Sequence, residues 1–333
     1  MAGDLTSLAD VLRGTDELLS SGRRAASRVT PSGFDALDTY LGGGLRAGEL
    51  CLLAGPQGLG KTTFALQVLR NAAVAGESAV YFSFEHDAAT LLERLVALEA
   101  GELLGVEALP LRRIREAMEG TGPTPGNLGA RLAGAPGGPQ AVDAVRGFAE
   151  RLHLHRSTGS STDISEIRRT IDEVHERTGR PPLVVVDYLQ KVLVPLGPSS
   201  EEERVTIVVE GLKDLALERD VPVMTIVAAD MAGLVAGQRL RVHHLRGSSA
   251  LAYEADVILV LNDKYDVVAR HHLVYGAGNI EQFRNWVVLS IEKNRSGLDK
   301  IDLEFRKRFE QGRFESDGQL VAERLIDERV YTE

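Results

Sequence analysis

Residues 50–75 read LCLLAGPQGLGKTTFALQVLRNAAVA and combine three patterns that belong to one structural unit. The apolar run at 50–54 has no helical spacing and predicts a strand buried on both faces. Residues 55–62, GPQGLGKT, fit G-x-x-x-x-G-K-[ST] at every fixed position, and the apolar residues that follow recur at helical spacing. An unrelated loop could match by chance, but strand, glycine turn and helix in this order supply the context of a phosphate-binding loop.

The residue types in this loop suit a nucleotide triphosphate. Glycines let backbone N–H groups point inward around the phosphates, and the helix start adds the positive end of its dipole. Lys61 neutralises phosphate charge and Thr62 can ligate Mg²⁺. We therefore expect ATP and Mg²⁺ as cofactors. The residues expected to hold them in this loop are Gly55, Gln57, Gly58, Gly60, Lys61, Thr62 and Thr63.

A second predicted strand ends in a carboxylate. Residues 183–186, LVVV, form an apolar run that Asp187 follows directly. A rigid buried strand that delivers one acid at its carboxyl end, beside a phosphate loop, is what a Mg²⁺ site needs. We expect Asp187 to hold the metal through water, together with Thr62.

Strands and helices alternate along the chain, which predicts an α/β fold with a mostly parallel sheet flanked by helices on both faces. Further strands are predicted at 79–83, 223–228, 257–261, 286–292 and 302–305. We expect a helix and link in residues 1–29 with the helix at 4–20, one domain at 30–315, and a polar tail from 316 with one weakly amphipathic helix. The Gly- and Pro-rich segment 121–140 predicts a mobile insertion.

Composition limits the classes of protein. With 44% hydrophobic and 26% charged residues, the 333-residue chain has the make-up of a soluble globular protein. A net charge of −10 argues against a generally basic surface, although a local basic lining inside an oligomer stays open. The one cysteine, Cys51, fits a buried apolar position and predicts a reducing, cytoplasmic compartment. No apolar run reaches spanning length, so neither a membrane anchor nor export is expected.

Two polar segments have more than one interpretation. The histidines of the alternating stretch 152–155, LHLH, could ligate a metal, but no carboxylate or cysteine is near in sequence, which favours an exposed strand face. Residues 230–246 have no core pattern and carry Arg239, Arg241 and Arg246. A solvated loop and a loop that faces nucleic acid are both open.

Several short motifs, in this order, resemble the DnaB-type replicative helicases. They are DYLQ at 187–190, LKDLA at 212–216, LR at 245–246, ADVI at 255–258 and KNRSG at 293–297. Phosphate loops are shared by many families, whereas their combination with DYLQ and the Lys-x-Arg run is more specific. The resemblance extends from about residue 28 to about residue 315. It implies a RecA-like P-loop NTPase core that works as a homo-oligomeric ring, expected to be hexameric, with ATP between subunits and single-stranded DNA as partner.

The resemblance also implies roles for residues outside the phosphate loop. Glu85 stands at the position of the family's water-activating glutamate, and a carboxylate there could reach a water in line with the γ-phosphate. Lys293 and Arg295 match the fingers that reach the neighbouring subunit's γ-phosphate. The alternative for this pair is a solvated strand end. The helix at 4–20 resembles the linker helix that docks on the adjacent subunit.

Three features depart from the family pattern. About thirty residues precede the core, so the N-terminal collar domain is expected to be missing. The position of the γ-phosphate-sensing glutamine falls on Ala228, and neither Ala229 nor Asp230 beside it could donate that hydrogen bond. Positions that are usually basic fall on Glu201 and Glu210, which weakens the case for DNA along that helix.

The sequence therefore predicts first a DnaB-like motor ATPase that hydrolyses ATP at subunit interfaces and acts on single-stranded DNA. The alternative is a non-unwinding regulatory ATPase that resembles KaiC or RadA, which LGGGL at 41–45 and the missing glutamine favour. A third interpretation is an assembly or scaffold protein gated by ATP. Stimulation of ATP hydrolysis by nucleic acid would separate the first from the other two.

Overall fold

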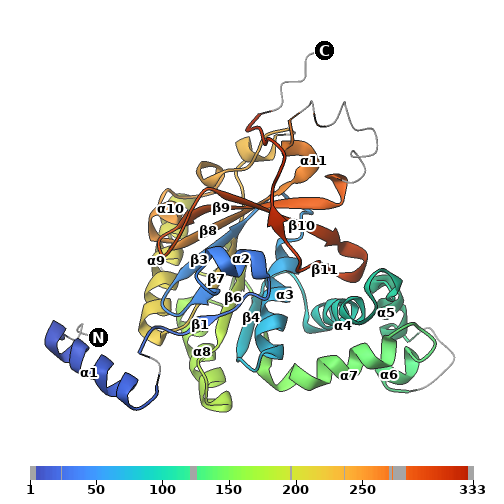
Figure 1. Ribbon diagram of the computed structural model, residues 1–333, viewed down its shortest axis with the longest axis horizontal. Coiled ribbons are helices and arrows are strands. Elements are labelled where there is room, and N and C mark those ends of the chain that lie inside the picture. The colour runs from blue at the N-terminus through green and yellow to red at the C-terminus, as the bar shows by residue number, and fades with distance from the viewer. Residues whose placement is uncertain are drawn as a thin grey trace.

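A ten-stranded sheet organises the chain. The computed structural model describes residues 5–23, 25–120, 126–195, 197–235, 237–269, 272 and 283–328. The strands lie in the order β11-β10-β9-β8-β3-β7-β6-β4-β5, with β12 beside β10 (Figure 1). The phosphate-loop strand β3 (Leu50–Ala54) lies near the centre, between β8 and β7, as its fully apolar sequence predicts.

The sheet is parallel in its larger part and antiparallel at one edge. The parallel strands are β3, β4 (Ala79–Ser83), β5 (Leu152–Arg156), β6 (Leu183–Asp187), β7 (Val223–Val227) and β8 (Val257–Asp263). The antiparallel edge consists of β9 (Trp286–Asn294), β10 (Ile301–Arg308), β11 (Arg313–Phe314) and β12 (Gln319–Leu320). A separate ribbon pairs β1 (Val29–Thr30) with β2 (Leu45–Arg46). The predicted α/β fold with a mostly parallel sheet is confirmed.

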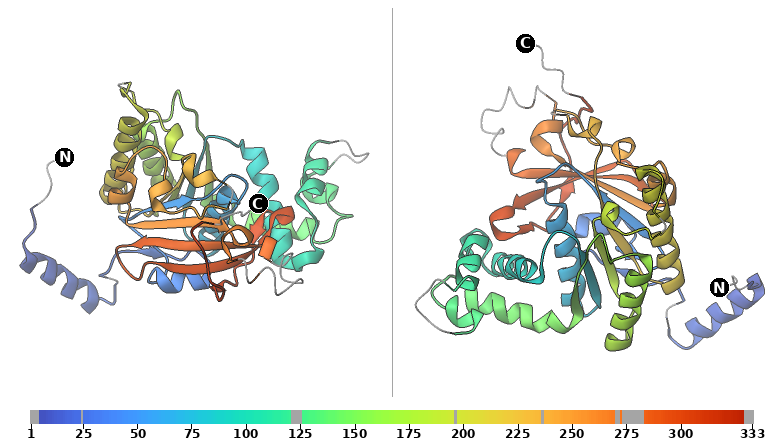
Figure 2. Two further views of the ribbon diagram at one scale, coloured as in Figure 1. Left: turned by 90° about the horizontal axis from the view of Figure 1, so that it is seen from above. Right: turned by 180° about the vertical axis from the view of Figure 1, so that it is seen from behind.

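Helices cover both faces of this sheet (Figures 1 and 2). One face carries α2 (Asp35–Tyr40), α3 (Lys61–Val74), α4 (Ala88–Leu104), α5 (Leu111–Met118), α6 (Leu128–Arg131) and α7 (Gly138–Phe148). The other carries α8 (Ile164–Thr178), α9 (Glu201–Arg219) and α10 (Ala250–Glu254), while the short α11 (Lys264–Val267) follows β8. Alternate residues of β3 enter the two cores, Leu53 on the α3 face and Leu52 on the α9 face, because side chains alternate along a strand.

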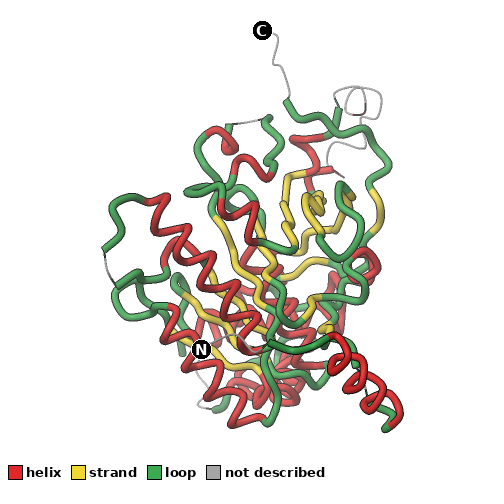
Figure 3. Tube along the Cα trace, turned by 90° about the vertical axis from the view of Figure 1, so that its left-hand side faces the viewer, coloured by secondary structure: helices red, strands yellow, loops and turns green. Residues whose placement is uncertain are grey.

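Helix α1 (Leu8–Ser20) stands apart from the body (Figures 2 and 3). It begins at Leu8, later than the predicted residue 4, and the side chain of its N-cap Ser7 accepts the Asp10 N–H at 3.1 Å. None of its residues is buried, so the apolar Leu8 and Leu12 face solvent.

The prediction of a mobile insertion is wrong for residues 126–140; residues 121–125 lie outside the described residues. Asn127 caps α6 by accepting the Ala130 N–H at 3.0 Å, and Leu132 is buried. Gly138 begins α7 where a Cβ would approach the Leu132 carbonyl oxygen to 2.6 Å. Composition counts glycines but does not show that one of them allows close packing of two helices.

The helix predicted in the tail is also wrong for its described part, residues 316–328. There β12 pairs antiparallel with β10, and Leu325 forms a bridge with Val268. The sheet edge supplies hydrogen-bond partners that a weak helical pattern cannot reveal.

Two expectations about metal and membrane concern the whole chain. No cluster of three or more His, Cys, Asp or Glu in the described ranges could hold a metal ion. His155 instead contacts Ser157 at 2.9 Å and Glu166 at 3.3 Å, and both histidines of the LHLH stretch are half-buried on β5. No described helix combines the length and apolarity needed to cross a membrane.

Candidate active site

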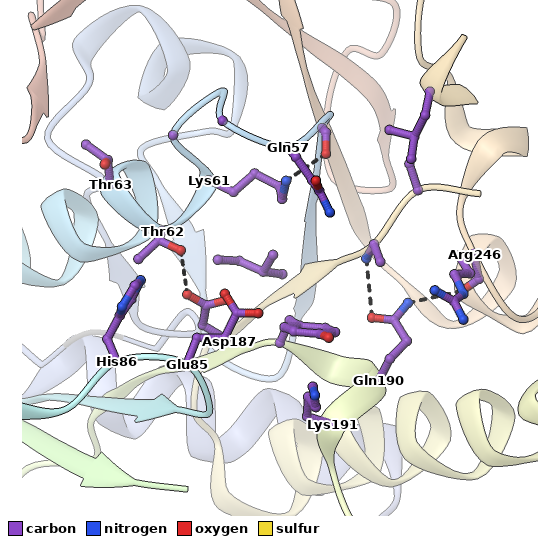
Figure 4. A pocket seen from close by; sticks show the side chains of 18 of the residues that line it. Gln57, Lys61, Thr62, Thr63, Glu85, His86, Asp187, Gln190, Lys191 and Arg246 are labelled. Atoms are coloured by element: carbon purple, nitrogen blue, oxygen red, sulfur yellow. Dashed lines mark hydrogen bonds between the residues drawn. The ribbon is translucent and has the colours of Figure 1, made fainter. Parts of the chain in front are cut away.

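The phosphate loop forms one wall of a pocket of about 1250 Å³ (Figure 4). Gly60, the N-cap of α3, has φ of 82°, in the left-handed region that favours glycine. A Cβ at Gly60 would also approach the Phe309 ring to 2.8 Å and the Phe314 ring to 2.9 Å. Backbone conformation and packing therefore both require glycine here. The predicted loop residues that line the pocket are Gly55, Gln57, Gly58, Gly60, Lys61, Thr62 and Thr63.

Lys61 is held at the loop by two carbonyl groups. Its Nζ donates to the Gly55 oxygen at 2.7 Å and to the Pro56 oxygen at 2.9 Å. Burial lowers the pKa of Lys61 from its ordinary value, and the nearby carboxylates of Asp187 and Glu85 oppose that shift. A phosphate would compete well for this ammonium because an anion binds it more strongly than a neutral carbonyl does.

Strand β6 delivers Asp187 to the start of α3. The Asp187 Oδ2 accepts hydrogen bonds from Thr62 Oγ1 at 2.7 Å and from the Tyr81 hydroxyl at 2.5 Å. Burial raises the pKa of Tyr81 well above its usual range, and the charge of Asp187 adds to this. Tyr81 therefore stays a hydrogen-bond donor and fixes the carboxylate, which is itself only 3% exposed.

The donor set fits Mg²⁺. A threonine hydroxyl and a carboxylate oxygen meet on adjacent structural elements, and both are hard oxygen ligands. Mg²⁺ keeps several waters and takes oxygens from substrate phosphates, so it needs no cage of three protein carboxylates. Thr62 and Asp187 would hold the ion next to the phosphate loop.

Two side chains of the turn after β4 face the same pocket. Figure 4 shows Glu85 beside Asp187 and His86 on the side of Thr62. The Ser83 hydroxyl fixes the turn because it accepts the His86 N–H at 3.0 Å and donates to the His86 carbonyl at 2.6 Å. Burial, followed by the positive charge of Arg94, lowers the pKa of His86 below its usual value. Glu85 is exposed and thus free to meet a water molecule.

Sequence reasoning missed several residues that line this pocket. Arg94 comes from α4, and its Nε is buried without a hydrogen-bond partner among the residues that the structure describes. Gln190, the last residue of the DYLQ motif, joins Ala228 to Arg246 through its side-chain amide. The motif could have signalled Gln190, whereas a single arginine in a helix gives no signal.

Lys293 and Arg295 lie at the opposite end of the sheet from their own phosphate loop. Lys293 Nζ donates to the Ala252 oxygen at 2.7 Å, and the Arg295 guanidinium contacts the Tyr253 oxygen and, at 3.4 Å, Asp256. Asp256 accepts the N–H of Leu50, the first residue of β3, whereas the phosphate loop follows the last residue of that strand. The structure therefore does not bring this pair together with Lys61 in one subunit.

The three arginines predicted to face nucleic acid have carboxylate partners. Arg239 is 3% exposed and pairs with Asp302, so the prediction of an Arg239 contact with nucleic acid is wrong for this conformation. Arg241 pairs with Glu292 at 2.8 Å and with Asp327. Arg246 is half-exposed, lines the pocket and pairs with Glu201 at 2.9 Å.

Comparisons with known proteins identify the family. Residues 25–227 match the model of an AAA domain, and residues 140–316 match the model of the DnaB-like helicase C-terminal domain. The chain is similar to the replicative DNA helicase DnaB of Leifsonia xyli subsp. xyli, with 27% identity over 74% of this chain and 50% of that protein. For the DnaB of Haemophilus influenzae the values are 25%, 69% and 45%. The chain thus spans about half the length of these relatives.

Solved structures show the same fold. One of them, the ATPase domain of another protein, superimposes with a TM-score of 0.71 at 21% identity, covering 93% of this chain and 99% of that one. A DnaB-like replicative helicase, whose structure was described together with its interactions with primase, gives a TM-score of 0.68 at 21% identity over 93% of this chain and 67% of that chain. With more than half of its residues in each family match, the chain belongs to the DnaB-like helicase C-terminal domain family, with an AAA/RecA-like ATPase fold.

Proposed function

We propose that the chain hydrolyses ATP with Mg²⁺ at interfaces between its own copies. The observation that carries this proposal is the 2.7 Å hydrogen bond between Thr62 of the phosphate loop and Asp187, with Lys61 and Glu85 on the same pocket. This arrangement supports nucleotide binding with a metal ion between the loop and the carboxylate.

Each side chain then has a role in the transfer of the γ-phosphoryl group. Lys61 and the backbone N–H groups of the loop bind the phosphates, while Asp187 and Thr62 hold the metal, whose charge offsets that of the leaving group. Glu85 accepts a proton from the attacking water as the new oxygen–phosphorus bond forms and the bond to ADP breaks. Lys293 and Arg295 of a neighbouring copy would stabilise the charge that develops on the phosphoryl oxygens.

A homo-oligomer, expected to be a hexameric ring, is part of this proposal. Two observations support it: the fingers lie away from their own phosphate loop, and α1 presents exposed leucines that a second copy could cover. A heterologous interface places different surfaces of two copies in contact and closes into a ring.

Single-stranded DNA is the proposed substrate of the motor, with Arg246 and Arg241 as the remaining arginine candidates. The same arginines favour a second candidate, a regulatory ATPase that needs no nucleic acid. Arg246 and Arg241 already have carboxylate partners, and Ala228 offers the pocket only a methyl group and backbone. Phosphate contacts with DNA would have to displace Glu201 and Glu292.

Two variants and one binding experiment test the proposal. Lys61→Ala should lose ATP binding, while Glu85→Gln should bind ATP and lose turnover, because binding and proton transfer depend on different groups. Near-normal turnover in Glu85→Gln would refute the assignment. Salt-sensitive binding of single-stranded DNA with an ATP analogue, at a slope of about 0.7 log units per phosphate contact, would favour the motor. Turnover without any such binding would favour the regulatory ATPase.

A further inference from the structure

Gln190 connects the nucleotide pocket to the segment that follows β7. It lies in a short 3₁₀ turn, Leu189–Lys191, is 8% exposed and lines the pocket. Its Oε1 accepts the Ala228 N–H at 3.3 Å, and its Nε2 donates to the Arg246 carbonyl at 3.1 Å (Figure 4). One side chain thus contacts both ends of the segment 228–246.

These two bonds continue a short antiparallel ladder. The Arg246 N–H donates to the Ala228 carbonyl at 2.9 Å, and the Asp230 N–H donates to the His244 carbonyl at 2.9 Å. Ala229 pairs with Leu245 between them. A primary amide offers the same donor and acceptor as a peptide group, so Gln190 forms the last rung of this ladder, at the pocket.

The ladder closes a segment whose two halves differ in their anchoring. The half before Arg246 is fixed, because Leu240 exchanges hydrogen bonds of 2.7 and 3.1 Å with the Asn262 side chain and Arg239 is buried. The half after β7 carries Met231, 82% exposed, and Val235, 60% exposed. A change at the ladder can therefore move the exposed half while the other half stays in place.

The amide of Gln190 can serve the ladder and a ligand at the same time. Its NH₂ group has two hydrogens, and among the described residues the Arg246 carbonyl accepts one of them. A phosphate oxygen of a bound nucleotide would accept the second in a charge-assisted bond. We infer that Gln190 is a positioning residue that couples nucleotide binding to the ladder at the base of 229–245, an inference that rests on the proposed nucleotide binding.

Hydrogen exchange measures this coupling directly. With the full chain and a non-hydrolysable ATP analogue plus Mg²⁺, exchange at the Asp230 and Arg246 amides should slow by at least about fivefold, the lower end of ordinary coupling between sites. In Gln190→Met, which keeps the chain length but has no amide, the analogue should still bind and the slowing should vanish. Failure of the wild type to bind the analogue would refute the proposed function, whereas binding without slower exchange would refute the coupling alone.

Gln67 provides a matched control. It is also a buried glutamine, and its amide makes the same two bonds, donating to the Phe314 carbonyl and accepting the Phe314 N–H, both at 2.9 Å. Gln67→Met should lower thermal stability about as much as Gln190→Met, yet keep the nucleotide-dependent exchange. Arg246→Ala, which keeps the accepting carbonyl, should keep it as well. Loss of the effect in all three variants, or its survival in Gln190→Met, would overturn the inference.

Discussion

At the scale of single residues, buried arginines differ in whether a carboxylate meets them. Arg70 contacts Glu99 through two nitrogens, at 2.5 and 2.7 Å, and Arg313 contacts Glu102 at 3.2 Å. Arg94 has no such ion pair within the described ranges, and its Nε is buried. A buried cation without an anion is costly, so the cost of Arg94 is best explained by an anion that binds in its pocket.

Arg94→Met and Arg70→Met should therefore act in opposite ways. Loss of Arg94 should leave the free energy of unfolding unchanged or raise it, and should weaken ATP binding by about tenfold, the value of one hydrogen bond to a charged group. Loss of Arg70 should lower stability by about 3 kcal/mol, because Glu99 stays buried without its partner. Chemical denaturation and ATP titration measure the two effects. Unchanged ATP affinity in Arg94→Met would exclude a phosphate contact.

Lys61 should give two opposite trends with pH. Between its lowered pKa and the ordinary value of 10.5, the unfolded chain binds a proton that the folded chain has lost, so the Lys61 contribution to the free energy of unfolding rises with pH. ATP affinity should fall across the same window, because the neutral amine no longer attracts phosphate. Titration of both quantities in the wild type and in Lys61→Met isolates the contribution. Identical pH profiles in the two proteins would contradict the lowered pKa.

At the scale of elements, the segment 230–246 is held to the sheet by its arginines. Arg239→Ala should lower the free energy of unfolding by about 3 kcal/mol, because it breaks a buried pair with Asp302 and the contact with Ser290. Arg246→Ala should cost less than about 1 kcal/mol, because that pair is half-exposed. Equal effects in thermal unfolding would contradict this difference. Loss of DNA binding in Arg239→Ala would then have to be judged against the folded fraction.

The same segment shows what sequence can and cannot predict. The phosphate loop and the strand that ends in Asp187 are local patterns, and the fold class, the sheet and the pocket wall followed from them. The partners of Arg239 and Arg241 lie 63 and 51 residues away, on β10 and β9, so a charged loop looked free. Arg94 and Tyr81 enter the site only because packing turns one helix and one strand toward Asp187.

At the scale of the whole molecule, one sheet separates two functional groups. The phosphate loop follows the carboxyl end of β3, while Lys293 and Arg295 lie beside its first residue, with roughly 13 Å of strand between them. A long, flexible arginine cannot cross that distance through a packed sheet. If the pair takes part in hydrolysis, it must act on the nucleotide of another copy.

Arg295→Ala should leave ATP binding intact and lower turnover by about 10³-fold, the value of a finger that stabilises the transferring phosphoryl group. Glu85→Gln should be inactive for a different reason, the loss of the proton acceptor. When the two variants are mixed, an interface that joins the intact Glu85 of one copy to the intact Arg295 of its neighbour should recover, giving roughly a quarter of wild-type turnover at equal ratios. Arg295 also contacts Asp256, so thermal unfolding of Arg295→Ala is the control for a structural effect. Mixed oligomers, verified by affinity tags on one variant, that show no recovery would place Arg295 in its own subunit's structure and remove it from the reaction.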